Sequence, residues 1–212
     1  MWGFKPDERN TLGNDVLVKN SNYIKHYTVI TPVTIQPLLD TVADTFPELA
    51  ELYTLIPEWV TKTDIGRVLV VYCNGGMYSD ADCFIQKPFN RHTEKHNVLL
   101  FTEHLCNSVE DLGPRECKNP ENVHRIANFC FGSKRAKHPF FKEVLEECIR
   151  RLDQLLRIEK KTTFEQSDVL WTCGPDVITT VYHRSKQNYT DVYVYDRTFL
   201  RHKCYGSWRN GS

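Results

Sequence analysis

The sequence lacks a net charge, a long apolar run and a closely spaced cysteine pair, and each absence excludes a class of protein. Lysine and arginine together number 27, as do aspartate and glutamate, over 212 residues. A formal net charge of zero argues against a protein that binds a polyanion by bulk charge neutralisation. No segment approaches the roughly 18–20 consecutive apolar residues that a membrane-spanning helix needs.

The N-terminus and the cysteines argue against further classes of protein. The opening residues, MWGFKPDERN, are polar and lack the apolar core of a signal peptide. None of the eight cysteines belongs to a C-x-x-C pair, which argues against a zinc ribbon and a thioredoxin motif. We therefore interpret the cysteines as reduced core residues, and we expect a cytoplasmic protein or a domain of a longer protein.

The apolar pattern predicts an α/β fold. Hydrophobic residues make up 41% of the chain, which is enough for a packed core in one domain over residues 1–212. Helices are predicted over 35–55 (with a break at Pro47), 62–74, 139–158 and 175–184. Strands are predicted over 24–30, 77–78, 97–102, 128–131 and 192–195. Because helices and strands alternate, we predict a mostly parallel or mixed central sheet flanked by helices.

The most informative local feature is the segment GGMYSDAD at residues 75–82. Its two glycines allow a sharp turn after the helix, and a short strand then delivers Asp80 and Asp82. Strand alternation points the two carboxylates to one side, where their repulsion favours a divalent cation. Mg²⁺ or Mn²⁺ would bridge these carboxylates to a diphosphate and stabilise the charge on a diphosphate leaving group.

Other interpretations of these residues stay open. A bare Asp-x-Asp is common in solvated acidic turns, where aspartate makes local hydrogen bonds. An aspartate-nucleophile phosphatase needs a hydrophobic strand before the pair and a small hydroxyl residue after it, and the flanking GGMYS and CFI fit this poorly. Upstream, Asp64 and Arg67 share a helix face, either as a surface ion pair or as contacts of a sugar and a phosphate.

The segment TDIGRVLVVYCNGGMYSDADCF at residues 63–84 resembles the core signature of a glycosyltransferase family with an Asp-x-Asp sugar-binding region. Fungal initiating mannosyltransferases and clostridial glucosylating toxins belong to that family. Three later blocks resemble further family blocks in the same order: RIANFCFGSKRAKHPF, LWTCGPDVITTVY and HKCYGSW. More narrowly, the chain resembles the N-terminal glycosyltransferase domains of large chlorella-virus enzymes.

The resemblance implies a GT-A fold with a Rossmann-like sheet, a UDP-sugar donor and Mn²⁺ or Mg²⁺ as the cofactor. It implies a metal site made of Asp80, Asp82 and His202. It implies donor contacts from Asp64, Arg67, Asp80, Asn128, Gly174, Pro175, Ser207 and Trp208. The catalytic set that it implies is Asp64, Arg67, Asp80 and Asp82. Trp2 would stack on the uracil or serve as a packing residue, because the opening strand typical of the family is missing here.

The implied reaction is transfer of a hexose or deoxyhexose, from a donor such as UDP-glucose or UDP-rhamnose, to a glycan or protein-linked glycan acceptor. The resemblance favours retention of configuration, and it implies host cytoplasm as the location if the chain is viral. The alternative is a non-catalytic module that binds a sugar nucleotide or a glycan. Three carboxylates near the later blocks are candidates for a role at the acceptor, without assignment: Glu103, Asp168 and Asp176.

Overall fold

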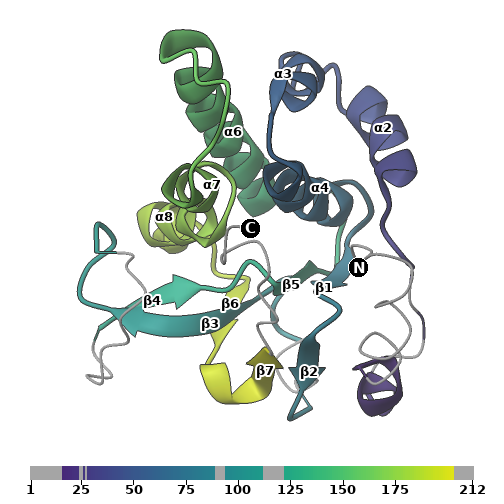
Figure 1. Ribbon diagram of the computed structural model, residues 1–212. Coiled ribbons are helices and arrows are strands. Elements are labelled where there is room, and N and C mark those ends of the chain that lie inside the picture. Colours follow the sequence, from purple (N-terminus) through teal and green to yellow (C-terminus); the bar gives the residue numbers. More distant parts are fainter. Residues whose placement is uncertain (1–15, 24–25, 27, 89–93, 112–121, 203–212) are drawn as a thin grey trace.

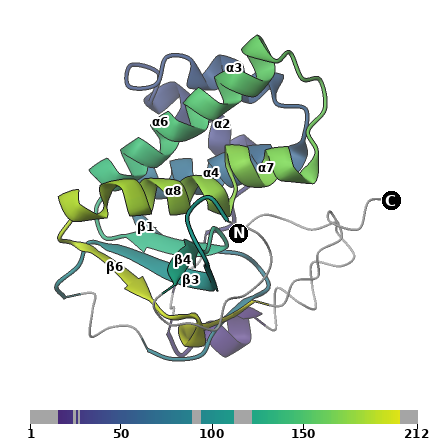
Figure 2. The same ribbon diagram turned by 90° about the vertical axis from the view of Figure 1, so that its left-hand side faces the viewer.

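The computed structural model describes residues 16–23, 26, 28–88, 94–111 and 122–202. These residues form a mixed α/β fold in which helices cover one face of a central sheet (Figures 1 and 2). Trp2, Ser207 and Trp208 lie outside the described residues, so the structure places none of their predicted contacts. Within the described residues, no helix combines the length and the apolar character needed to cross a membrane.

The predicted helices are present, with shifted ends. The helices are α2 (Pro32–Thr41), α3 (Leu49–Leu55), α4 (Trp59–Asn74), α6 (Pro139–Asp153), α7 (Gln166–Thr172) and α8 (Pro175–Ser185). A π-helical turn continues α6 over Gln154–Ile158, and residues 16–20 form a further short helix. The predicted break at Pro47 falls between α2 and α3, whereas α7 was not predicted. Helix α6 begins sharply because Pro139 starts it and His138 Nδ1 accepts a hydrogen bond from Phe140 N at 3.2 Å.

The central sheet is mixed but mostly antiparallel. The strands are β1 (Gly76–Ser79), β2 (Cys83–Ile85), β3 (Val98–Cys106), β4 (Val123–Ile126), β5 (Cys130–Ser133), β6 (Val192–Tyr195) and β7 (Leu200–His202). The order is β1-β5-β3-β4 with antiparallel pairs, and β6 runs parallel to β3. Strands β2 and β7 form a separate antiparallel pair, which we call the β2–β7 ribbon.

Several strand predictions need correction. The strand over 24–30 is wrong where the structure describes it, since residues 26 and 28–30 are irregular and lead into α2. The mixed form of the predicted sheet is confirmed, whereas a mostly parallel sheet is wrong, because β4 and β5 both run antiparallel to β3 while β6 runs parallel to it. Strands β2, β4 and β7 were missed because three or four residues carry too little alternation to be recognised.

Two groups of buried side chains hold these layers together. The larger group fills the space between the helices and the sheet. The smaller one packs the other face of the sheet and contains Cys83, Leu99, Phe101, Ala127, Phe129, Cys130 and Tyr195. Because Cys83 lies in β2, and Leu200 of β7 packs against the same group, this second core fixes the ribbon to the sheet. The six cysteines described are free thiols, and five of them are buried.

Gly174 separates α7 from α8 because the two helices pack closely there. A Cβ atom at this position would lie 2.8 Å from both the Cα and the carbonyl oxygen of Leu170. We expect Gly174→Ala to lower the free energy of unfolding by about 1–3 kcal/mol, because the clashing atoms are backbone and must shift. Urea unfolding of this variant beside Gln166→Ala, at an exposed site on α7, tests the expectation. Equal stability of the two variants would contradict it.

Candidate functional site

Two glycines create the turn that delivers the carboxylate pair. Helix α4 ends at Asn74, and the φ angles of Gly75 and Gly76 are 69° and 81°, a region that other residues rarely adopt. A Cβ on Gly75 would also come within 3.1 Å of the Ser133 carbonyl oxygen. Strand β1 therefore starts close against β5 and ends just before Asp80.

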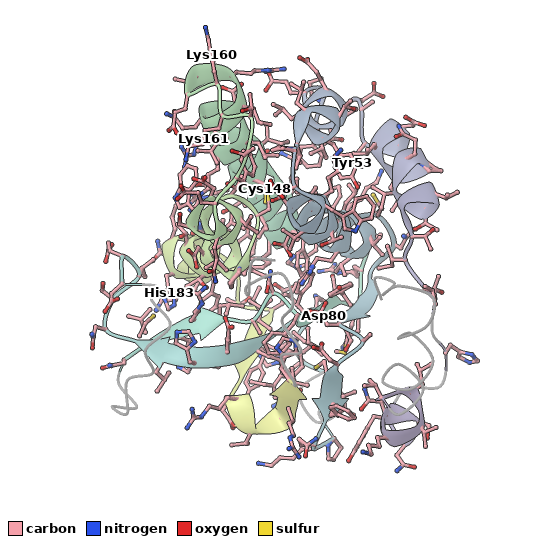
Figure 3. The ribbon with its side chains drawn as sticks, in the orientation of Figure 1. Tyr53, Asp80, Cys148, Lys160, Lys161 and His183 are labelled. Carbon is pink, nitrogen blue, oxygen red and sulfur yellow. The ribbon has the colours of Figure 1, made fainter. Side chains whose placement is uncertain are left out.

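Main-chain hydrogen bonds fix the turn that follows β1. The N–H of Asp80 donates to the carbonyl oxygen of Phe129 at 2.8 Å. The N–H of Cys83 donates back to the carbonyl oxygen of Asp80 at 3.1 Å. These two bonds close the segment from Asp80 to Cys83 into a turn, and they hold Asp80 at the edge of the sheet below α4 (Figure 3).

Asp80, Asp82 and His202 form a cluster of potential metal ligands. One ligand atom from each of the three lies within 4.8 Å of the other two. His202 Nε2 is 3.0 Å from Asp82 Oδ1 and 3.8 Å from Asp80 Oδ2. All three side chains keep some solvent exposure, between 11% and 24%. Two carboxylates with one imidazole are a donor set that suits Mn²⁺, and also Mg²⁺ if the carboxylates dominate.

The ribbon brings His202 to this cluster from 120 residues away. His202 lies opposite Cys83 in the antiparallel pairing of β2 with β7. Its ring stacks on Phe129, with centroids 4.0 Å apart and the planes 12° from parallel. Phe129 therefore supports the cluster twice, through its ring under His202 and through its carbonyl oxygen on Asp80.

Arg67 is buried and joins the metal-ligand cluster to α4. Its Nη2 lies 2.8 Å from Asp64 Oδ1, and its Nη1 lies 3.4 Å from Asp80 Oδ1. Nη1 also donates to the carbonyl oxygen of Asn128 at 2.8 Å. The guanidinium carbon stands 5.0 Å from the centre of the Tyr78 ring, and the Tyr78 hydroxyl donates to Asp80 Oδ1. One positive charge thus compensates two carboxylates, and its position is fixed on several sides.

Asp64 lies beneath this guanidinium with only 4% of its surface exposed. Asn128 Nδ2 donates a hydrogen bond to Asp64 Oδ1 at 3.3 Å. Burial raises the pKa of Asp64 to about 7, although the Arg67 guanidinium lowers it and the Asp80 carboxylate raises it further. Asp64 therefore exchanges its proton near neutral pH, and it can accept or donate a hydrogen bond to a hydroxyl group.

The remaining sequence candidates separate into different environments. Glu103 Oε2 lies 3.0 Å from Arg125 Nε, and Asp176 Oδ1 lies 2.8 Å from Arg125 Nη1. Both carboxylates are therefore neutralised by one buried arginine. Asp168 instead accepts from Glu165 N at 3.0 Å and from Lys161 Nζ at 2.6 Å. It caps the start of α7, so the contacts that the structure gives it are structural ones.

Comparison with known proteins shows a similarity to glycosyltransferases. Residues 6–99 match the family described as the glycosyltransferase sugar-binding region containing the DXD motif. The chain is also 24% identical over 171 residues to the initiation-specific alpha-1,6-mannosyltransferase of Candida albicans. The chain is therefore similar to DXD-containing glycosyltransferases over residues 6–99 and, at lower identity, over most of its length. The matched family region contains Asp64, Arg67, Asp80 and Asp82, while Asn128 and His202 lie beyond it.

The extent of these similarities differs between proteins. The match to the fungal mannosyltransferase covers 76% of this chain but only 43% of that protein, so the chain spans less than half of its relative. The PaToxG glycosyltransferase has a similar fold, with a TM-score of 0.52 and 17% sequence identity. That likeness covers 89% of this chain and 68% of the other. The chain therefore shares its fold, over most of its length, with a solved glycosyltransferase.

Sequence reasoning missed one residue that supports the cluster. Phe129 follows Asn128 directly within the segment RIANFCFGSKRAKHPF. Nothing in its type or spacing indicates that its ring lies under His202.

Proposed function

We propose that the protein is a glycosyltransferase that uses a divalent metal to move a hexose or deoxyhexose from a UDP-sugar to a glycan or protein-linked glycan acceptor. The observation that carries the proposal is the convergence of Asp80, Asp82 and His202 beside the buried Arg67. The donor set fits Mn²⁺ or Mg²⁺. A donor of the UDP-glucose or UDP-rhamnose type, retention of configuration and the GT-A class complete the proposal, on the basis of the family resemblance.

Under this proposal, one set of residues would bind the diphosphate of the donor and another set would bind its sugar. A bound metal ion supplies charge stabilisation for the diphosphate leaving group. Asp80, Asp82 and His202 would hold that ion, while Arg67 adds a fixed positive charge that needs no reorganisation. The buried Arg67 Nε has no hydrogen-bond partner among the described residues, which leaves an N–H donor for a ligand oxygen. Asp64, one turn of α4 before Arg67, and Asn128, which donates to Asp64, would bind hydroxyl groups of the donor sugar.

Other assignments extend the proposal to residues with less structural support. Gly174 and Pro175 would line the sugar or acceptor side, and Ser207 and Trp208 would close over the diphosphate. The proposal treats residues 1–212 as one catalytic domain located in the cytoplasm, or in host cytoplasm if the chain is viral. We propose no nucleic-acid partner.

A panel of nucleotide sugars tests the donor class. We expect UDP-sugars together with Mn²⁺ to raise the melting temperature, because a ligand at 100 times its Kd stabilises the native state by about 2.7 kcal/mol. GDP- and dTDP-sugars are the matched comparisons, and a chelator should remove the shift. Stabilisation by a GDP-sugar alone would replace the UDP assignment, and no shift with any nucleotide would contradict the proposal.

Release of UDP separates an enzyme from a binding module. We expect slow hydrolysis of the preferred UDP-sugar even without an acceptor, and faster release with one. A clear thermal shift without any UDP release, with glycan acceptors present, would instead favour a non-catalytic sugar-nucleotide binder.

A further inference from the structure

The outer edge of β2 is covered by one side chain, that of Asn20. This asparagine is fully buried at the end of the short helix over 16–20. Its Nδ2 donates to the carbonyl oxygen of Cys83 at 3.0 Å, and its Oδ1 accepts from the N–H of Ile85 at 2.9 Å. Because residues two apart in a strand present their main-chain groups to the same side, one amide here replaces part of a neighbouring strand.

Strand β2 thus lies between two partners. Strand β7 pairs along one edge, and the short purple helix lies beyond the other edge (Figure 1). The same helix makes a second contact with β2, because Lys19 Nζ stands 5.2 Å from the centre of the Phe84 ring. The helix therefore anchors β2 at successive positions along the strand.

Cys83 connects this anchor to the candidate metal ligands. Its N–H donates to the carbonyl oxygen of Asp80, its carbonyl oxygen accepts from Asn20, and it lies opposite His202 in the ribbon. It also directly follows Asp82 in the chain. A shift of β2 would therefore move Asp82 relative to His202.

We infer that Asn20 is a positioning residue for the metal site, acting through β2 on Asp82 and His202. The inference rests on the proposed function, because it requires that the cluster binds a divalent ion. Removing the amide leaves a buried carbonyl oxygen and a buried N–H without their partners, so β2 loses a fixed position rather than one weak contact. Groups that orient metal ligands typically change metal affinity by 10- to 100-fold when they are replaced.

The test is a direct Mn²⁺ titration of the full chain, with free Mn²⁺ read from its electron paramagnetic resonance signal. We expect Asn20→Ala to weaken Mn²⁺ binding about 10-fold or more. Asn20→Asp is the near-isosteric second variant, which keeps the acceptor for Ile85 N and places an oxygen against the Cys83 carbonyl. We expect it to weaken Mn²⁺ binding at least as much as alanine does.

Asn97→Ala is the matched control. Asn97 Nδ2 donates to Asp191 Oδ2 at 2.6 Å, so this amide also ties distant segments together, and its hydrogen bond joins two residues outside the ribbon. We expect it to lower the melting temperature and to leave the Mn²⁺ affinity within twofold of the wild type. If Asn20 had a purely structural role, Asn20→Ala would behave like Asn97→Ala: its melting temperature would fall and its Mn²⁺ affinity would stay within twofold of the wild type.

The outcomes separate this inference from the proposed function. Wild-type affinity in both Asn20 variants, with binding abolished by Asp82→Ala, would overturn the role of Asn20 and leave the metal site intact. Absence of Mn²⁺ binding by the wild type would overturn the metal site, and the role of Asn20 with it. If both variants fail to fold, hydrogen exchange of the wild type tests the coupling between β2 and the metal site. Because coupling is reciprocal, Mn²⁺ should then slow amide exchange in the segment that contains Ile85. Exchange there that is unchanged by Mn²⁺ would count against the inference.

Discussion

Replacing Asp82 by alanine is expected to lower sugar transfer from the UDP-sugar by roughly 100- to 1,000-fold, the usual effect of losing a group that stabilises charge in the transition state. Asp82 is mostly buried, and its Oδ1 lies 3.0 Å from His202 Nε2, so alanine removes the centre of the ligand cluster. The measurements are the rate of UDP release and the Mn²⁺ affinity of the same preparation. The melting temperature should fall little, because the change also relieves repulsion between two nearby carboxylates.

The control for this experiment is Asp44→Ala, which removes a carboxylate from an exposed position between α2 and α3. We expect the activity and the Mn²⁺ affinity of this control to equal those of the wild type. Full turnover by the Asp82 variant, or by the wild type in the presence of a strong chelator, would show that the cluster holds no essential metal.

Replacing Arg67 by methionine is expected to destabilise the fold by about 3–5 kcal/mol and to remove donor binding. The destabilisation follows because Asp64 would remain buried without its partner, which is the usual cost of breaking a buried ion pair. Burial raises the pKa of Asp64 to about 7, so this carboxyl group is mostly protonated at pH 6 and mostly charged at pH 8. The loss of stability should therefore be larger at pH 8 than at pH 6. Urea unfolding at both pH values measures it.

A double variant separates the two consequences of losing Arg67. In Arg67→Met with Asp64→Asn, both buried charges are gone, so we expect most of the stability to return while UDP-sugar turnover stays lost. Arg135→Met is the control, because this arginine is exposed and its pair with Asp191 should contribute less than about 1 kcal/mol. Recovery of turnover in the double variant would contradict a role for Arg67 at the donor.

The sequence contained enough information for the local half of the site. A three-residue spacing on a helix predicted that Asp64 and Arg67 share a face. In the structure, Arg67 Nη2 lies 2.8 Å from Asp64 Oδ1. The two glycines predicted the turn that delivers Asp80 and Asp82, and both have positive φ angles. These features depend on neighbours within a few residues, where helix and turn geometry is set by residue type.

The contacts between residues far apart in the sequence could not be predicted and became clear only from the structure. The ribbon strands have only three residues each, and they are held to the sheet by the second core rather than marked by an alternating pattern. Family resemblance, not residue chemistry, indicated His202 as a ligand, and the stacking of His202 on Phe129 had no sequence signal. The same limit explains the wrong strand at 24–30, where β-forming residue types are overridden by their surroundings.

The ribbon also has a consequence for the order in which the molecule assembles. Asp82 and His202 meet only after about 120 residues have been closed into a loop, whereas Asp64, Arg67 and Asp80 lie within one short stretch of chain. Closing a loop of that length costs entropy that local contacts do not, so we expect α4 and β1 to form before the ribbon does during refolding. Pulse-labelling hydrogen exchange would show this order. A chain interrupted before β7 would keep its sugar-side residues but have only two of the three candidate ligands, so the capacity to hold a metal ion would be the last property that a growing chain acquires.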